Sequence, residues 1–212
     1  MDIKRFSLRE QVYDGIKNKI LNKEYKIGEY LNIQELTREL SVSNTPVREA
    51  LSALVSDGLV DVSDNYKYKV VNLNEKEIID LNQTILILIL GALDYIKRED
   101  KFKLLENMLE NSLANYKKDK DKNELFDYQF VRLSTDFDRQ FVLATNNKFL
   151  IQEFDNLMNL FVLTSVYNKK EYRDIHVKEH YQMLESIRET NIDKTKNILK
   201  NHFSKNLSDM DY

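Results

Sequence analysis

Hydrophobic positions recur every three or four residues along most of the chain, which predicts a largely helical protein. The first such segment covers residues 7–22. Ser7 and Glu10 stand at its start in the spacing of a capping box, in which each side chain accepts a hydrogen bond from the backbone N–H of the other. A turn containing Gly28 follows, and Asn32 is expected to cap a second helix over 32–40. The apolar stripe of the first segment consists of Leu8, Val12, Ile16 and Ile20.

The clearest pattern lies at 41–60, SVSNTPVREALSALVSDGLV. Thr45 is expected to cap a third helix there, with Pro46 at the first helical position, where a backbone N–H would have no partner anyway. Gly58 ends the helix because glycine adopts the left-handed conformation found just past a helix end. Two helices joined by about four residues, the second with a polar outer face, are typical of a helix-turn-helix that reads the DNA major groove. The outer face carries Thr45, Arg48, Glu49 and Ser52.

A short hairpin is expected after the third helix. Residues 60–62 and 69–71 alternate apolar and polar side chains, as short strands do, and Asn65 suits the turn between them. A hairpin in this position is a wing, which can reach an adjacent groove or a phosphate group.

The remaining chain reads as helices throughout, and Asn74 with Glu77 is expected to cap the first of them. The expected fold is mainly α: an N-terminal winged helix-turn-helix of three helices and a β-hairpin wing at 1–71, a linker at 72–74, and an antiparallel helical bundle at 75–212. The bundle helices are expected near 75–97, 101–118, 124–145, 147–168, 170–189 and 192–208.

Composition limits the class of protein further. The 212 residues are 42% hydrophobic and 32% charged, which is typical of a globular protein, and without cysteine no disulfide or thiolate metal site can form. The N-terminal segment lacks the apolar core of a signal peptide, and the run Ile85–Ala92 is too short to span a bilayer, so we expect a cytoplasmic protein without a membrane partner.

The charge balance of the two halves is nearly even. Residues 1–72 carry 11 basic and 11 acidic side chains, and the rest of the chain carries 21 and 24, which accounts for the net charge of −3. A DNA-binding domain without net positive charge must use a local basic patch.

Residues 1–71 resemble the winged helix-turn-helix domain of GntR-family bacterial transcription regulators. The run TPVREAL at 45–51, at its spacing from Gly58-Leu59-Val60, is the most specific match. The helical remainder resembles the FadR-type (FCD) effector domain. The resemblance implies a regulator rather than an enzyme: a homodimer, more often a repressor, that binds a near-palindromic DNA operator on the nucleoid and holds a small-molecule effector in its bundle. The other matching residues are Ile20, Gly28, Leu31, Glu35-Leu36, Val42-Ser43 and Leu54 in the first domain, and Phe137, Ala144, Asn147, Leu150, Glu179-His180 and His202 in the second.

The resemblance also implies where DNA is read, namely at the start of the third helix, on the helix before it and at the wing tip. Arg48 is the foremost candidate because it can bind guanine or a phosphate, although a salt bridge to Glu49 or to a neighbouring helix is an alternative. Thr45 can be a cap alone. Asn44 stands in place of the family's usual arginine, and an unusual operator is therefore expected. The DNA-binding candidates are Gln34, Ser43, Asn44, Thr45, Arg48, Tyr66, Lys67 and Lys69, of which Tyr66-Lys67 replaces the family's basic residue and glycine.

Metal-binding FCD domains use an aspartate and a histidine four residues apart, together with two later histidines. His180 and His202 match the later pair, whereas Ser134 and Asp138 fall on the first pair. Asp138, His180 and His202 could hold zinc or another divalent ion, and with Ser134 they would line the effector pocket. The alternative is a decayed site in which the histidines are polar pocket residues. His176, one turn before His180, could supply a third imidazole, although an exposed surface residue is the commoner outcome there.

The stretch Thr84–Leu90 is apolar after Thr84, where many relatives carry an arginine and a glutamate. It is expected to be a buried helix or a dimer seam; if it lines the cavity, the effector is less acidic than usual, because a carboxylate would lack its cation. Two functional alternatives remain open at this point. One is a dimeric DNA-binding regulator whose bundle no longer senses a ligand, and the other is a metal-dependent hydrolase that uses Asp138, His180 and His202.

Overall fold

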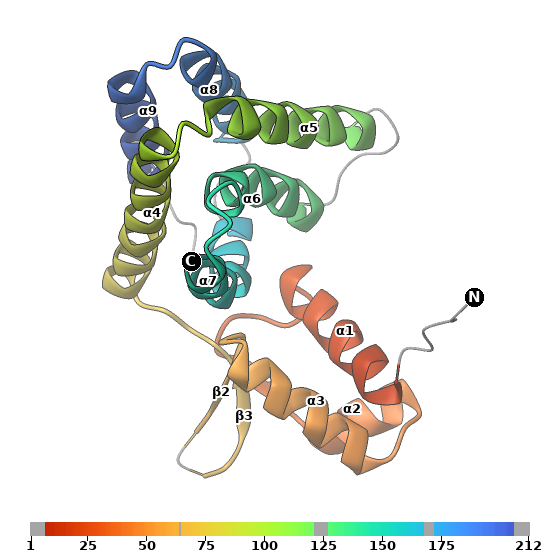
Figure 1. Ribbon diagram of the computed structural model, residues 1–212. Helices are drawn as coiled ribbons and strands as arrows, with labels where there is room; N and C mark the ends of the chain where they lie inside the picture. Colours follow the sequence, from red (N-terminus) through yellow and green to blue (C-terminus); the bar gives the residue numbers. More distant parts are fainter. Residues whose placement is uncertain (1–6, 64, 121–126, 168–171, 206–212) are drawn as a thin grey trace, which may run out of the picture. The chain divides into compact units, whose positions relative to one another are not determined.

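The computed structural model describes residues 7–63, 65–120, 127–167 and 172–205. Over these residues the chain is mainly helical with one small sheet, which confirms the predicted fold class (Figure 1). The chain divides into two compact units, Met1–Leu73 and Asn74–Tyr212.

The first unit is a three-helix domain with a three-stranded antiparallel sheet. α1 and α2 both pack on α3, and Val12, Ile16, Val47 and Leu51 are among the buried residues between them. The predicted capping box of Ser7 is present. The elements are α1 (Leu8–Leu21), β1 (Tyr30–Leu31), α2 (Ile33–Leu40), α3 (Asn44–Ser56), β2 (Val60–Val62) and β3 (Tyr68–Val70).

The start of α3 differs from the prediction. The helix begins at Asn44 with Ser43 in the N-cap position, so Thr45 lies inside the first turn and is not the cap. Pro46 is consequently the third helical residue rather than the first. This costs no hydrogen bond, because the first four N–H groups of any helix lack a partner within the helix. The end is as predicted: Asp57 closes α3, and Gly58 follows at φ +72°.

The wing is present, with one strand more than expected. β2 and β3 pair in the order Val60↔Val70, Asp61↔Lys69 and Val62↔Tyr68. β3 therefore begins and ends one residue earlier than the predicted strand at 69–71. β1 then pairs with the outer edge of β3, which gives the sheet order β1-β3-β2. Asn65 lies in the turn between β2 and β3, and Tyr66 follows in the left-handed conformation at φ 55°.

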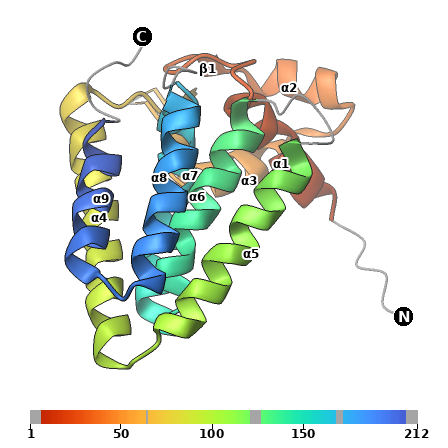
Figure 2. The ribbon, with the colours of Figure 1, turned by 90° about the horizontal axis from the view of Figure 1, so that it is seen from above.

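The second unit consists of packed helices, and Figure 2 shows them side by side. α5 packs on α6 and α8, α6 packs on α7, and α4 contacts α6, α7 and α9. The predicted capping box of Asn74 and Glu77 opens the first of them. The helices are α4 (Glu75–Arg98), α5 (Phe102–Lys120), α6 (Asp127–Leu143), α7 (Lys148–Val166), α8 (Tyr172–Arg188) and α9 (Ile192–Lys205).

α4 is long and apolar enough to cross a membrane by length and composition alone. Its inner side is part of the bundle core, where Ile85, Ile89, Ala92 and Leu93 are fully buried. A core helix of a bundle passes the same test, and packing within the chain accounts for the apolar residues on this inner side. Only 39% of its apolar window is buried within the chain, however, and Ile87 is 67% exposed.

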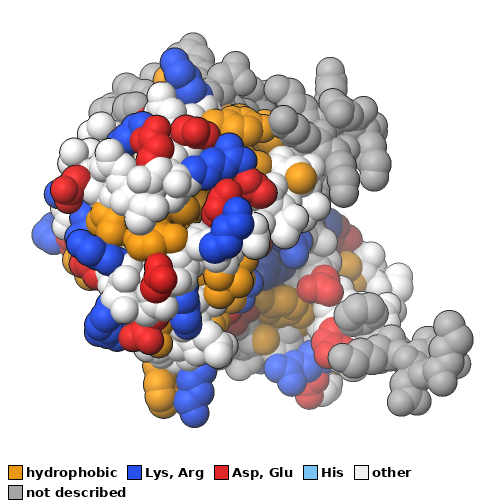
Figure 3. All heavy atoms as spheres, turned by 45° about the horizontal axis from the view of Figure 1, so that its top comes forward, with side chains coloured by type: hydrophobic (Ala, Val, Ile, Leu, Met, Phe, Trp, Pro, Cys, Tyr) orange, Lys and Arg blue, Asp and Glu red, His pale blue; other side chains and the backbone are white. Residues whose placement is uncertain are grey.

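The surface carries charges of both signs. On the face shown in Figure 3, Lys and Arg side chains are interspersed with Asp and Glu, and separate apolar patches lie between them. Neither sign dominates this face, which agrees with the nearly even charge balance of the sequence.

Candidate functional site

The outer face of α3 is polar and open to solvent. Asn44, Thr45, Arg48, Glu49 and Ser52 are exposed there, as is Ser43 just before the helix. The opposite face of the helix is fully buried through Val47, Ala50, Leu51 and Leu54. The apolar face therefore fixes the helix in the domain while the polar face stays available. Gln34, the candidate on α2, is also exposed.

The far end of α3 is tied to α1 by side chains. The hydroxyl of Tyr13 donates a hydrogen bond to Asp57 Oδ2, at the residue that closes α3. Burial, followed by the contact with Asp57, raises the pKa of Tyr13 well above its ordinary value. The hydroxyl is consequently protonated at neutral pH and able to donate. This bond holds the end of α3 against α1 and so helps to fix the direction of the exposed face.

The wing tip presents an aromatic side chain. Tyr66 is 87% exposed, and Tyr30 on β1 is 58% exposed. The Nζ atom of Lys67 lies 5.9 Å from the centroid of the Tyr30 ring, within the range of a cation–π contact. Lys69 lies on β3 opposite Asp61. The wing thus brings an exposed ring and two basic side chains to one short hairpin.

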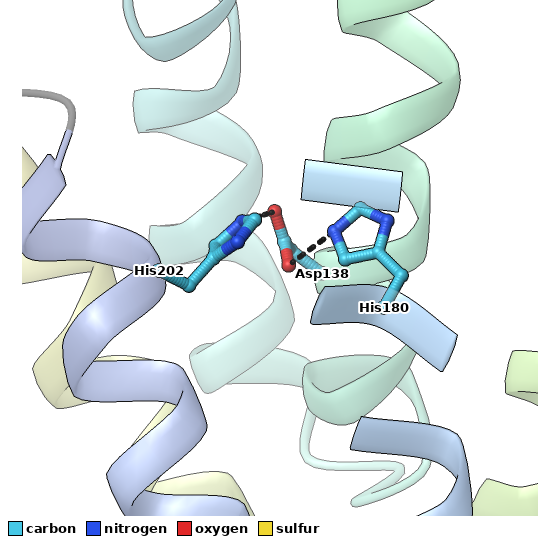
Figure 4. A group of neighbouring side chains, drawn as sticks. All are labelled: Asp138, His180 and His202. Atoms are coloured by element: carbon cyan, nitrogen blue, oxygen red, sulfur yellow. Dashed lines mark ion pairs between the residues drawn. The ribbon is translucent and has the colours of Figure 1, made fainter. Parts of the chain in front are cut away.

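In the second unit, three side chains from three helices meet in the interior. Figure 4 shows Asp138 on α6 between His180 on α8 and His202 on α9. All three residues are buried, with relative exposures of 1%, 3% and 1%. The structure therefore brings together the three residues that the sequence suggested as metal ligands.

The spacing of these groups is too wide for hydrogen bonds. Asp138 Oδ1 lies 3.6 Å from His180 Nε2, and Asp138 Oδ2 lies 3.8 Å from His202 Nε2. Among the described residues, neither Asp138 Oδ1 nor His180 Nε2 has a hydrogen-bond partner. In a tetrahedral zinc site with bonds of about 2.1 Å, neighbouring ligand atoms lie about 3.4 Å apart. The observed separations are thus close to those of ligands around a metal ion.

The three groups differ in their tendency to hold a proton. Burial raises the pKa of Asp138, but the charge of His202 and the contact with His180 outweigh it, so that the pKa of Asp138 lies below its ordinary value. Burial lowers the pKa of His180, and Asp138 offsets this only in part. Burial also lowers the pKa of His202, but Asp138 and Glu179 outweigh it and raise that pKa to about 9. An ionised Asp138 and a neutral His180 can bind a metal ion directly, whereas His202 must lose its proton when it binds one.

Glu179 was not among the candidate ligands of the sequence, although it precedes His180 in a run that matched the family. It is buried, and its Oε2 atom lies 2.9 Å from Nδ1 of His202. The rings of Phe137 and His180 stack with centroids 4.1 Å apart. Glu179 and Phe137 thus fix the ring orientations of the two histidines, a role that only the packing of the helices reveals.

Ser134 and His176 are the two further residues that the sequence suggested near this site. Ser134 lies one turn before Asp138 on α6 and is half-buried. The interpretation of His176 as an exposed surface residue is wrong. It is half-buried, and its ring centroid lies 4.4 Å from that of His202, because α8 turns this face toward α9. Burial, followed by the charge of His202, lowers the pKa of His176 to about 3.

Comparison with known families and proteins gives matches over most of the chain. Residues 8–66 match the family model of bacterial regulatory proteins of the gntR family, and residues 98–205 match that of the FCD domain. The uncharacterized HTH-type transcriptional regulator YdhC of Bacillus subtilis (strain 168) is 25% identical over 203 residues, which are 92% of this chain and 87% of YdhC. The HTH-type transcriptional repressor GlaR of Escherichia coli (strain K12) is 35% identical over 69 residues, which are 32% of this chain and 31% of GlaR.

Solved structures share the fold. E. coli McbR/YncC has a TM-score of 0.68 at 21% identity, with 95% of this chain and 96% of that chain covered. A putative GntR transcriptional regulator from Rhodococcus sp. RHA1 has a TM-score of 0.69 at 14% identity, with 93% and 94% covered. The arrangement of a helix-turn-helix domain followed by a helical domain is therefore common to these proteins.

Proposed function

The chain belongs to the GntR family of bacterial transcription regulators and carries an FCD effector-binding domain, and from this we propose that it represses transcription as a homodimer on a near-palindromic operator, under the control of a ligand in its helical bundle. The hydrolase alternative is set aside, because both families and the named relatives are transcription regulators rather than enzymes. A regulator of this kind acts in the cytoplasm, on DNA of the nucleoid.

The exposed polar face of α3 carries the proposal of DNA binding. A helix anchored by a fully buried apolar face, with five exposed polar residues on the other side, has the form of a recognition helix. Arg48 lies near its start, where recognition helices contact base edges. Its guanidinium can donate two parallel hydrogen bonds to O6 and N7 of guanine. Ser43, Asn44 and Thr45 precede it on the same surface, and Gln34 contributes from α2.

The wing supports a second contact with the operator. Lys67 and Lys69 can bind phosphate oxygens, which adds affinity without reading sequence. Tyr66-Lys67 replaces the family's basic residue and glycine. Without the glycine the wing backbone stays farther from the DNA, and the ring of Tyr66 packs against sugar instead. The substitution of Asn44 for a cationic residue removes one further charge. We therefore propose an operator that differs from the commonest sites of the family.

The outer side of α4 supports a homodimer. Ile87 is 67% exposed at its centre, and the flanking Leu86, Leu88 and Leu90 are only half-buried within the chain. Burial of such an apolar surface against a second copy of the chain removes it from water and so favours a dimer. A two-fold symmetric dimer would then present two recognition helices to the two half-sites of a near-palindrome.

Repression rather than activation is the proposed outcome of DNA binding. GlaR, which is 35% identical to this chain over 69 residues, is named a repressor. This name supports the proposal of repression.

The residues Asp138, His180 and His202 fit a divalent metal ion of the zinc type. One carboxylate and two imidazoles, 3.6 and 3.8 Å apart and with two unpartnered buried atoms, are a suitable ligand set. An ion bound there would supply a positive centre that holds α6, α8 and α9 together and attracts an anionic group of the effector. Ser134 lies on the same helix as Asp138 and is proposed as part of the effector pocket. Without a metal, the protonated His202 would take this place between Asp138 and Glu179.

A gel-shift experiment with the DNA upstream of the protein's own gene tests the proposed function. The wild-type chain is expected to give a specific shift that unlabelled random DNA does not displace. Arg48→Ala is expected to lose this shift, whereas Arg132→Ala, which removes an exposed arginine of α6, serves as the matched control and retains it. A wild-type chain without a specific shift, or an Arg48→Ala variant equal to wild type, would contradict the proposal.

A further inference from the structure

The ligand set of the bundle extends beyond the three residues of the proposed metal centre. Two groups of potential ligands overlap in the interior, Asp138–His180–His202 and His176–Glu179–His202. Within each group the ligand atoms lie within 4.8 Å of one another. His202 belongs to both groups, so they form one continuous cluster of three imidazoles and two carboxylates.

Glu179 and Asp138 use different nitrogen atoms of His202. Nδ1 lies 2.9 Å from Glu179 Oε2, which is a hydrogen bond, whereas Nε2 lies 3.8 Å from Asp138 Oδ2, which is not. A carboxylate bonded to one ring nitrogen fixes the tautomer and directs the other nitrogen toward the metal. The geometry therefore makes Glu179 the residue that orients His202, and it leaves Nε2 as the ligand atom.

His176 is placed on the same side of α8 as His180, since the two residues are four apart in one helix. Its ring centroid is 4.4 Å from that of His202, closer than the 5.0 Å between the rings of His180 and His202. His176 is thus at least as near to the shared histidine as is a proposed ligand. The chain has no other histidine, and both His176 and His180 lie beside His202.

We propose that His176 is a fourth ligand of the metal centre, together with Asp138, His180 and His202, and that Glu179 is the positioning residue of His202. This inference rests on the proposed metal centre and names its complete ligand set. Three imidazoles with one carboxylate favour zinc, cobalt, nickel or copper and disfavour magnesium and calcium, which prefer all-oxygen sites. Ser134 stands four residues before Asp138 on α6, where metal-binding relatives carry a ligand. In the proposed set, the imidazole of His176 on α8 takes the place of that ligand.

Titration of the full-length, chelator-treated protein with Co²⁺, followed by its visible absorption, tests the ligand set. The wild-type chain is expected to bind one Co²⁺ that Zn²⁺ displaces. His176→Ala is expected to bind at least about tenfold more weakly and with a changed absorption spectrum, because one imidazole is lost from the ion. Lys178→Ala, an exposed change two residues along the same helix, is the matched control and leaves both unchanged.

The outcomes separate the two levels of the proposal. If His180→Ala loses Co²⁺ while His176→Ala retains the wild-type affinity and spectrum, His176 is not a ligand and the metal centre of the proposed function stands. If the wild-type chain binds neither Co²⁺ nor Zn²⁺, the centre itself is refuted and the assignment of His176 with it. Circular dichroism of each variant verifies its folding.

The positioning role of Glu179 has its own test. Glu179→Gln keeps a group that can hydrogen-bond to His202 but removes the charge. We expect about tenfold weaker Co²⁺ binding with the ligand-dependent spectrum retained, because the four ligands stay the same. An affinity equal to wild type would overturn the positioning role, and a spectrum like that of His176→Ala would make Glu179 a ligand instead.

Discussion

Tyr66 combines a strained backbone with an exposed aromatic ring at the tip of the wing. Its φ of 55° lies in the left-handed region, which costs a residue with a Cβ atom roughly 1 kcal/mol relative to glycine. The ring gains nothing from burial, since the residue is 87% exposed. Its backbone N–H donates a hydrogen bond to the carbonyl of Ser63, but the ring stays exposed, and an aromatic ring held at the tip in this conformation is more simply explained by a contact with a partner.

Substitution of Tyr66 separates strain from DNA contact. Tyr66→Gly removes both the strain and the ring, whereas Tyr66→Ala removes only the ring. We expect both variants to bind operator DNA several-fold more weakly than wild type. Only Tyr66→Gly is expected to gain stability, by about 1 kcal/mol over Tyr66→Ala, in urea denaturation followed by circular dichroism. Equal stability of the two variants would contradict the role of strain.

One hydrogen bond between side chains joins α1 to the end of α3, in addition to their apolar packing. Tyr13→Phe removes the hydroxyl that donates to Asp57 and leaves that carboxylate without this donor. We expect a loss of about 1 to 2 kcal/mol in the free energy of unfolding. Tyr25→Phe is the matched control, because the Tyr25 hydroxyl makes only an exposed hydrogen bond of 3.3 Å to Glu39 and is expected to contribute less than about 0.5 kcal/mol. Equal losses in the two variants would argue against a special role of Tyr13.

α4 offers a test of the dimer. Ile87→Glu places a charge at the centre of the exposed apolar side of α4, where burial by a second copy would then be unfavourable. Sedimentation velocity is expected to show a monomer, or a dimer at least about tenfold weaker. Leu104→Glu makes the same kind of change on α5, at a residue that is 46% exposed, and is expected to leave the dimer intact. A dimer of Ile87→Glu with wild-type strength would assign the interface to another surface.

The helices were predictable from the sequence because the signals that define them are local. The capping boxes of Ser7 and Asn74 and the left-handed glycine at position 58 fix ends of helices through neighbouring residues alone. The strand at Tyr30–Leu31 was not predictable, since a two-residue strand exists only through pairing with β3, far along the chain. The start of α3 was misassigned by two residues because several adjacent polar residues could each cap it.

The site was predictable only in part for the same reason. Asp138, His180 and His202 could be named from positions that resemble a family pattern, and the structure brings them together. The burial of His176 and the hydrogen bond of Glu179 to His202 depend on how α8 packs on α9. No local spacing encodes that contact, so these two residues required the folded structure.

The bundle as a whole should respond to the metal ion. An ion that binds only the folded state at a hundredfold excess over its dissociation constant stabilises by about 2.7 kcal/mol. In calorimetry of the full chain, Zn²⁺ is therefore expected to raise the melting temperature, and a chelator to reverse the change. His202→Ala removes the ligand common to both groups and is expected to abolish the effect. A shift of equal size in that variant would show that the ion binds elsewhere.

The central claim is that this chain reads a specific DNA sequence through α3. Fluorescence anisotropy with a labelled fragment from upstream of its own gene, in parallel with a scrambled fragment of equal length and at one fixed salt concentration, tests it most directly. We predict tight binding to the upstream fragment, at least about a hundredfold weaker binding to the scrambled one, and a loss of about 1 to 3 kcal/mol in Arg48→Ala that is confined to the upstream fragment. Equal affinity of the wild-type chain for both fragments, unchanged in Arg48→Ala, would contradict the account.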